Sequence, residues 1–104
     1  MGFVDVAASE EIPEGEATGF PIEDLEIAVA RVDGAVYAFS DICTHRRCNL
    51  SMGGEVDGTT ITCECHGSMF SIVTGEPEEG PATDTIAVYP VREADGRVEV
   101  EVEV

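Results

Sequence analysis

The sequence predicts an all-β domain built from antiparallel sheets. Its apolar segments are short and rich in β-branched residues, and glycine-containing turns separate them. No window of the chain shows an apolar stripe with the 3.6-residue period of an amphipathic helix. With 104 residues, the chain has room for a single domain, residues 1–104, with a modest core.

The earliest hairpin signal lies in the first half of the chain. Residues 27–32 and 35–39 are apolar and partly β-branched, and an Asp-Gly pair at 33–34 separates them. Asp-Gly favours a tight hairpin turn, because glycine accepts the positive φ that the turn requires. The same dipeptide at 57–58 and at 95–96 predicts further turns at those positions.

The last quarter of the chain predicts two more strands. Residues 85–91 are mostly apolar, and Pro90 places the end of that strand at an edge or a bend. In residues 98–104, valine and glutamate alternate strictly. A period of two is typical of a strand with one buried face and one solvent-facing face.

Four residues in the middle of the chain carry its chemistry. Cys43 and His45 form a Cys-X-His pair, and Cys63 and His66 form a Cys-X-X-His pair after 17 intervening residues. The first pair follows the strand predicted at 35–39, and the second follows a short apolar stretch. Loops at the ends of adjacent hairpins converge, so we expect all four side chains to bind one metal centre.

This ligand pattern is that of a Rieske iron–sulfur centre, in which two thiolates hold one iron and two imidazoles hold the other. The flanking sequence strengthens the match. The chain resembles the Rieske-type ferredoxins that supply electrons to ring-hydroxylating oxygenases. The motifs that carry the resemblance are CTHRRC (43–48), CECHGSMF (63–70), TGE (74–76) and EGPA (79–82).

The resemblance implies one [2Fe–2S] cluster per chain, with Cys43 and Cys63 as thiolate ligands and His45 and His66 as imidazole ligands. Neutral imidazoles leave less negative charge around the irons than thiolates do. An added electron is then repelled less, and the potential rises from about −400 mV to between about −150 and +300 mV. Two cysteines and two histidines can also bind a structural zinc ion, although Cys-X-His is uncommon in zinc sites.

The resemblance also implies the Rieske fold. In this fold a small cluster-binding subdomain, here about residues 40–78, is inserted in a β-sandwich-like base of antiparallel sheets. The segment around Pro81 resembles the proline loop that covers the cluster in this family. An ordinary turn between strands is the alternative, because Gly-Pro also produces one.

Two cysteines remain once the ligands are assigned. Cys48 and Cys65 match positions that form a disulfide in the Rieske subunits of cytochrome bc complexes, whereas the oxygenase ferredoxins usually lack this pair. A Cys48–Cys65 bridge would contribute roughly 3 kcal/mol in the chain-entropy model. Two unbridged thiols are the alternative that a reducing cytosol favours.

Two residues after the second motif bear on the reduction potential. Ser68 matches a family position whose hydroxyl donates to a cluster sulfur and so raises the potential. The alternative is a turn residue that bonds the backbone. Phe70 falls where high-potential members carry a tyrosine hydroxyl. Ser68 can donate a hydrogen bond and raise the potential, whereas Phe70 cannot donate one. We therefore expect an intermediate reduction potential.

The charge of the chain is strongly negative. Five arginines and no lysine face 22 carboxylates, for a formal charge of −17. Nucleic acid and anionic membranes are repelled, whereas a basic protein partner is attracted; an adaptation for solubility or salt tolerance is the alternative. Arg46 and Arg47 directly follow the ligand His45. We expect these two arginines, with His45 and His66, to form a docking contact, or the arginines to balance nearby carboxylates such as Glu64.

The function that the resemblance implies is electron transfer rather than catalysis. The partners would be a flavin-dependent ferredoxin reductase and a Rieske non-haem iron terminal oxygenase. No apolar run spans a membrane and residues 1–8 lack a secretory signal, so we expect a cytoplasmic monomer. The alternatives are the small subunit of an assimilatory nitrite reductase, a Rieske domain of a quinol- or arsenite-oxidising complex, and a zinc-stabilised interaction module.

Overall fold

The structure, a computed structural model, describes residues 2–22, 25–42, 49–51, 55–63, 67–79 and 85–102. Eleven strands and one turn of 3₁₀ helix lie in these ranges. In chain order they are β1 (Gly2–Ala8), η1 (Ser9–Glu11), β2 (Ala17–Ile22), β3 (Leu25–Val32), β4 (Ala35–Ser40), β5 (Glu55–Asp57), β6 (Thr60–Thr62), β7 (Met69–Ser71), β8 (Pro77–Glu79), β9 (Val88–Tyr89), β10 (Val91–Ala94) and β11 (Arg97–Val102). The described part of the chain contains no helix with the length and apolarity of a membrane span.

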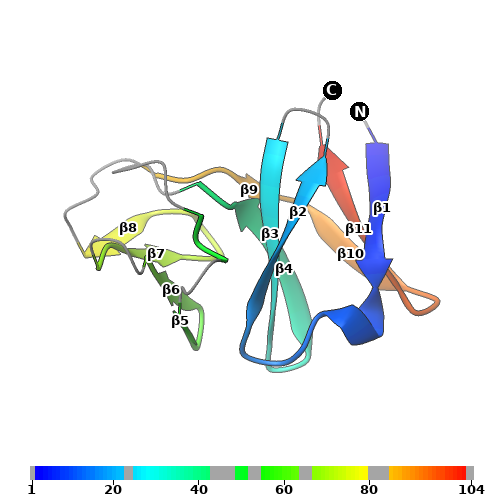
Figure 1. Cartoon of the computed structure of the whole chain (residues 1–104), viewed down its shortest axis with the longest axis horizontal. Coiled ribbons are helices and arrows are strands. Elements are labelled where there is room, and N and C mark those ends of the chain that lie inside the picture. Colours follow the sequence, from blue (N-terminus) through cyan, green and yellow to red (C-terminus); the bar gives the residue numbers. More distant parts are fainter. Residues whose placement is uncertain are drawn as a thin grey trace.

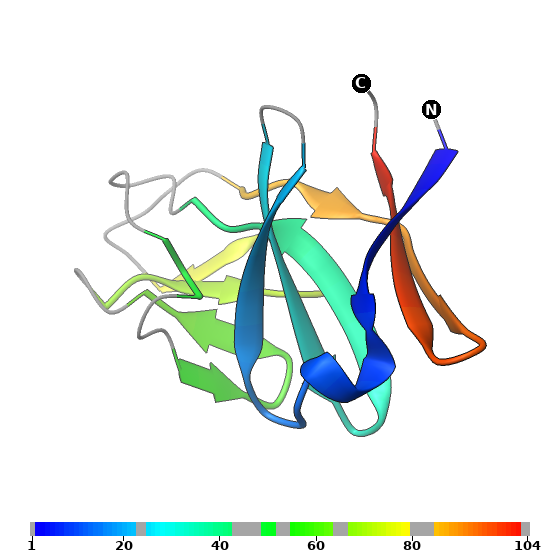
Figure 2. The ribbon, with the colours of Figure 1, turned by 45° about the vertical axis from the view of Figure 1, so that its right-hand side comes forward.

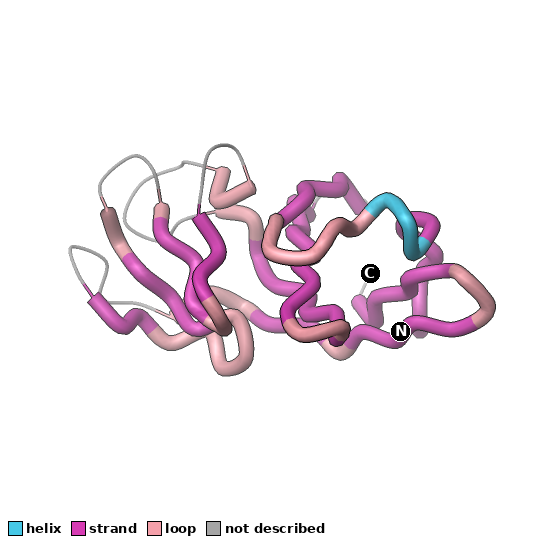
Figure 3. Tube along the Cα trace, turned by 90° about the horizontal axis from the view of Figure 1, so that it is seen from below, coloured by secondary structure: helices cyan, strands magenta, loops and turns pink. Residues whose placement is uncertain are grey.

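The strands form three antiparallel sheets with the orders β1-β11-β10, β2-β3-β4-β9 and β5-β6-β7-β8. The prediction of an all-β, antiparallel fold is confirmed. The first two sheets make a sandwich-like base, and the third is a small sheet whose strands fall between β4 and β9 in the sequence (Figure 1). Seen from below, the small sheet lies beside the base rather than over it (Figure 3).

The central sheet, β2-β3-β4-β9, is buried on both faces because it lies between the other two. Ile27 and Val29 of β3 belong to an apolar core shared with the valines of β11. Ala28 and Ala30 of the same strand belong to a second core shared with the small sheet. As a result, β3 has four consecutive buried residues, a pattern that is typical of a strand covered on both faces.

The hairpins predicted from Asp-Gly pairs are confirmed. Asp33 and Gly34 join β3 to β4 with φ values of 51° and 82°. Asp95 and Gly96 join β10 to β11 with φ values of 53° and 76°. Two successive positive φ values define the hairpin turn whose twist matches that of the flanking strands. Gly58, with φ of 60°, lies in the turn between β5 and β6.

The strand predicted at residues 85–91 is wrong in part. Only Val88 and Tyr89 form β9, and the chain then changes sheet at Pro90, because β10 pairs with β11 instead. The segment before β9 makes isolated backbone hydrogen bonds rather than the continuous ladder of a strand. The N–H of Ile86 donates to the Gly75 carbonyl, and the Ala87 carbonyl accepts from Ser40, both at 2.8 Å.

The alternation predicted for the last strand is confirmed as far as the structure describes it. Val98, Val100 and Val102 are buried, whereas Glu99 and Glu101 are partly exposed; residues 103–104 lie outside the described ranges. Because β11 is the central strand of its sheet and pairs with β1, both ends of the described chain lie at the same end of the base (Figure 2).

Candidate metal centre

The first predicted ligand loop has a closed base. An isolated antiparallel bridge pairs Ile42 with Asn49. The N–H of Leu50 donates to the carbonyl of Asp41 at 2.6 Å. Residues 43–48 therefore connect two flanking segments, 41–42 and 49–50, that hydrogen bonds hold together. The strand before this loop is β4, as predicted.

The second ligand loop is the connection of the β6–β7 hairpin. Cys63 directly follows β6, and its N–H donates to the carbonyl of Ser68 at 2.7 Å. The N–H of Gly67 donates to the carbonyl of Cys63 at 2.9 Å. Gly67 has φ of 76°, a backbone conformation that residues other than glycine rarely adopt. Glycine is therefore favoured where the chain turns back toward β7.

The ends of both loops rest on the same apolar core. Leu50, at the exit of the first loop, and Cys63, at the start of the second, belong to the core between the central sheet and the small sheet. Phe70 of β7 fills this core and is completely buried. The described bases of the two loops thus share one core, and the convergence of their ligands stays a prediction.

The structure places only some of the predicted site residues. Cys63 is 1% exposed, and Ser68 is completely buried beside it in the hairpin. The remaining predicted residues lie outside the described ranges: Cys43, His45, Arg46, Arg47, Cys48, Cys65, His66 and Pro81. Their roles as ligands, bridge partners, docking groups and loop cover stay predictions.

The described donor and its surroundings fit an iron–sulfur group. The sulfur of Cys63, buried just after β6, is shielded from water by the core around it, and burial of this kind is one of the levers that set the potential of such a centre. Each loop base is also closed by its own hydrogen bonds, which limits the movement of ligands carried by the loops.

Sequence reasoning missed two residues that organise this frame. Asp41 is buried and accepts hydrogen bonds from Asn49 and Ser51. Gly19 of β2 approaches the same group so closely that a Cβ atom would lie 2.7 Å from an oxygen of Asp41. A glycine inside a strand often indicates such a close approach, but no strand is predicted from the sequence around Gly19.

Comparison with known proteins decides the family. The chain matches the Rieske [2Fe-2S] domain over residues 2–90. It belongs to the Rieske family. The family supports an iron–sulfur cluster as the group bound at this site.

Similar proteins extend this assignment. The chain is 35% identical to the biphenyl dioxygenase ferredoxin subunit of Pseudomonas sp. strain KKS102, with 88% of this chain and 84% of that protein covered. The structure of the Sphingomonas yanoikuyae B1 ferredoxin superposes with a TM-score of 0.91 at 32% identity, covering 98% of this chain and 100% of that one. A ferredoxin in the complex of reduced oxygenase and oxidized ferredoxin in carbazole 1,9a-dioxygenase gives 0.87 at 33% identity, over 94% of this Rieske chain and 100% of that one.

Proposed function

We propose that this chain is the Rieske ferredoxin of a ring-hydroxylating dioxygenase system, a one-electron carrier and not itself an enzyme. The observation that carries the proposal is the combined ligand pattern and hairpin frame. Cys63 is buried after the end of β6, and Leu50, which follows the first ligand loop, belongs to the same core. The similar ferredoxins match over almost their entire length.

The residues that would hold one [2Fe–2S] cluster are Cys43, His45, Cys63 and His66. When bound, the cluster supplies the exchange of a single electron. The protein binds it between two loops, excludes water through the core around Cys63, and orients the ligands through the hydrogen-bonded loop bases. The proposed ligand set is supported by its spacing and by the position of Cys63 in the structure.

The proposed partners follow from the similar proteins. The carbazole dioxygenase ferredoxin is seen in complex with its oxygenase, and we extend this kind of partner to our chain. A flavin-dependent NAD(P)H reductase is the proposed electron donor. We place the exchange in the cytoplasm, where NAD(P)H is available, and propose a monomer. Because the relatives are dioxygenase ferredoxins, we favour this function over that of a nitrite reductase subunit or of a Rieske domain in a quinol- or arsenite-oxidising complex.

We further propose that residues 1–104 form one domain and that residues 40–78 are its cluster-binding subdomain. The four short strands β5 to β8 support this division, because they form a sheet separate from the base. An intermediate reduction potential is expected from Ser68, a donor to the cluster, combined with Phe70, which cannot donate. Phe70 is instead part of the core.

Metal analysis and spectroscopy of the purified protein test the proposal. We expect two irons and two acid-labile sulfides per chain, and a reduced state with the EPR signal of a mixed histidine–cysteine [2Fe–2S] centre. The reduced protein should pass its electron to the oxygenase of a biphenyl dioxygenase system. A colourless protein with one zinc ion per chain would contradict the proposal.

A further inference from the structure

A buried carboxylate lies at the base of the first ligand loop. The side chain of Asp41 accepts three hydrogen bonds: from the Ser51 N–H at 2.7 Å, from the Ser51 hydroxyl at 2.8 Å and from the Asn49 amide at 2.8 Å. Asp41 as a whole is only 3% exposed. These bonds join the residue just before the loop to residues just after it.

The backbone of Asp41 adds two more connections. Its N–H donates to the carbonyl of Glu26 in β3, at 2.9 Å, and its carbonyl accepts from Leu50. The loop entrance is therefore fixed to the central sheet and to the loop exit at the same residue. We call Asp41, Asn49 and Ser51 the carboxylate clamp.

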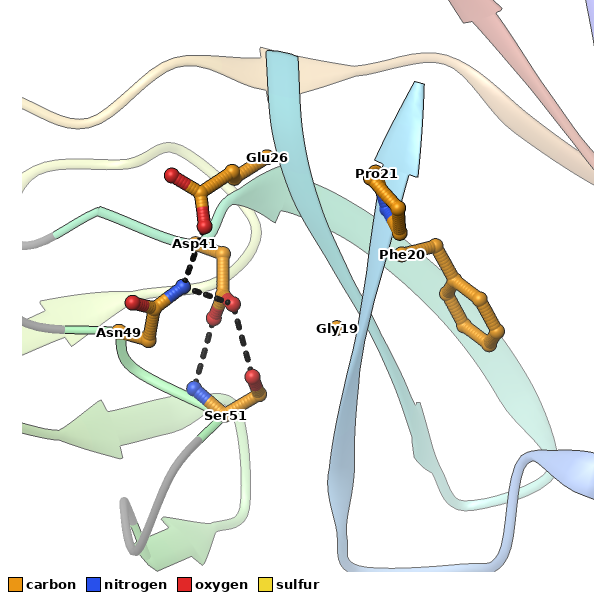
Figure 4. Close-up of a pocket in the computed structure, with 7 residues that line it drawn as sticks. All are labelled: Gly19, Phe20, Pro21, Glu26, Asp41, Asn49 and Ser51. Atoms are coloured by element: carbon orange, nitrogen blue, oxygen red, sulfur yellow. Dashed lines mark hydrogen bonds between the residues drawn. The ribbon is translucent and has the colours of Figure 1, made fainter.

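The central sheet supports this clamp directly (Figure 4). The Asn49 amide, which donates to Asp41, also donates to the Glu26 carboxylate at 2.9 Å. Gly19 of β2 faces the clamp, and a Cβ atom there would lie 2.7 Å from both Asp41 Oδ2 and Ser51 Oγ. The absence of a side chain at Gly19 therefore leaves room for the carboxylate.

A buried carboxylate is costly unless its oxygens are satisfied, so its presence calls for a physical reason. Apolar residues could fill the same space, but they could not join both ends of the loop by directional bonds. The carboxylate also brings a negative charge two residues before a predicted thiolate ligand. In a poorly solvated region, such a charge disfavours the addition of an electron nearby.

We propose that Asp41 is a positioning residue of the cluster, acting through the carboxylate clamp. It fixes the loop that carries Cys43 and His45 relative to Cys63, and its charge lowers the reduction potential. The inference rests on the proposed ligand set. It assigns to Asp41 a role that is distinct from ligation.

Matched variants of the cluster-loaded protein separate charge from geometry. Asp41→Asn keeps the shape but removes the charge and one acceptor. Ser51→Ala removes the hydrogen bond from the Ser51 hydroxyl to Asp41 and keeps the charge of Asp41. Asp57→Asn is the control, because it makes the same change at an exposed carboxylate beside the β5–β6 turn, at the opposite end of β6 from Cys63. The measurements are the midpoint potential, the EPR g-values, and the rate of iron release to a chelator.

We expect Asp41→Asn to raise the midpoint potential, shift the g-values and release iron several-fold faster. Ser51→Ala should shift the g-values and speed release, with a smaller change in potential. Asp57→Asn should resemble the wild type in all three. A wild-type potential and g-values in Asp41→Asn would overturn the inference.

If Asp41→Asn does not retain the cluster, Ser51→Ala and Gly19→Ala provide the test. Gly19→Ala pushes on the same two oxygens without changing the charge. Both should shift the g-values and speed iron release relative to Asp57→Asn, and wild-type behaviour in both would overturn the inference. A wild-type protein that binds no cluster would instead contradict the proposed function, so the two failures are distinguishable.

Discussion

At the scale of single residues, the β6–β7 hairpin has two buried positions that are predicted to be functional. Cys63 and Ser68 lie at the two ends of its connecting loop and are joined by a backbone hydrogen bond. Ser68 is completely buried, so its hydroxyl lies in a setting where one donor to a charged group has a large effect. Phe70, two residues later, is in the apolar core instead.

Ser68→Ala should lower the reduction potential, because it removes a proposed donor that stabilises the electron-rich state. The expected drop is on the order of 60 mV, a tenfold change in electron affinity. Ser71→Ala is the matched control, since Ser71 lies at the other end of β7 and accepts bonds from Val73 and Thr74. Protein-film voltammetry of both variants measures the effect, and equal potentials would refute the role of Ser68.

At the scale of elements, one arginine ties several segments of the base together. Arg31 in β3 donates to the carbonyls of Ser9, Ile12 and Gly34, and pairs with Glu93 of β10 at 2.6 Å. The hydrogen bond from the Arg31 guanidinium holds the pKa of Glu93 down to about 2, against an ordinary value of 4.5. Its side chain is 28% exposed, so solvent screens part of the interaction.

The low pKa of Glu93 predicts a pH-dependent contribution to stability. The ionised carboxylate pairs with Arg31 in the folded state, so the contribution is present above pH 4.5 and is lost as the pH falls toward 2. Glu93→Gln should cost about 1 kcal/mol at pH 7 and progressively less below pH 4.5. Urea unfolding of the wild type and the variant between pH 7 and pH 3 measures this. Glu99→Gln, which removes a more exposed pair with Arg92, is the control; a pH-independent cost at Glu93 would contradict the prediction.

The two ligand loops are also predicted to be joined covalently. If Cys48 and Cys65 are bridged, thiol counting after cluster removal, under denaturing and non-reducing conditions, should find neither of them reactive. Cys48→Ser should then lower the free energy of unfolding by roughly 3 kcal/mol and speed loss of the cluster. Two reactive thiols at these positions in freshly purified protein would contradict the bridge.

At the scale of the whole molecule, charge is unevenly neutralised. The three arginines in the described part of the chain all lie in the base, where each pairs with a carboxylate: Arg31 with Glu93, Arg92 with Glu99, and Arg97 with Asp5. The described residues of the small sheet and its turns, 55–63 and 67–79, contain carboxylates but no arginine or lysine. The end of the molecule with the proposed cluster site is therefore strongly negative, apart from Arg46 and Arg47 in the first ligand loop.

Electron transfer to a basic partner should accordingly be slower at high salt. The net charge of −17 attracts a basic partner over long distances at low salt. At 0.1 M salt, the attraction is largely screened beyond about 10 Å. Stopped-flow kinetics at low protein concentration across a salt series measures this dependence. A rate that does not change with ionic strength would remove electrostatic steering from the account.

Arg46 and Arg47 are predicted to act in the opposite sense, at the contact itself. Replacing both by glutamine should slow transfer at low salt, even though the net charge becomes more negative. Replacing Arg92 and Arg97 by glutamine changes the net charge equally in the base and is the matched control. A rate that is unchanged or higher in the Arg46 and Arg47 variant would identify them as intramolecular charge balancers.

The sequence by itself determined the fold class and the hairpin turns, and it predicts the chemistry of the site. These properties depend on local features: alternation in residues 98–102, Asp-Gly pairs that accept positive φ, and the spacing of cysteines and histidines. The sheet change at Pro90 was predicted only as a bend, because the partner of a strand depends on residues distant in the sequence. The carboxylate clamp was decided by tertiary structure alone. Asp41, Gly19 and Glu26 come together only when β2, β3 and the loop after β4 are packed, and no local pattern shows which buried oxygen will find its donors.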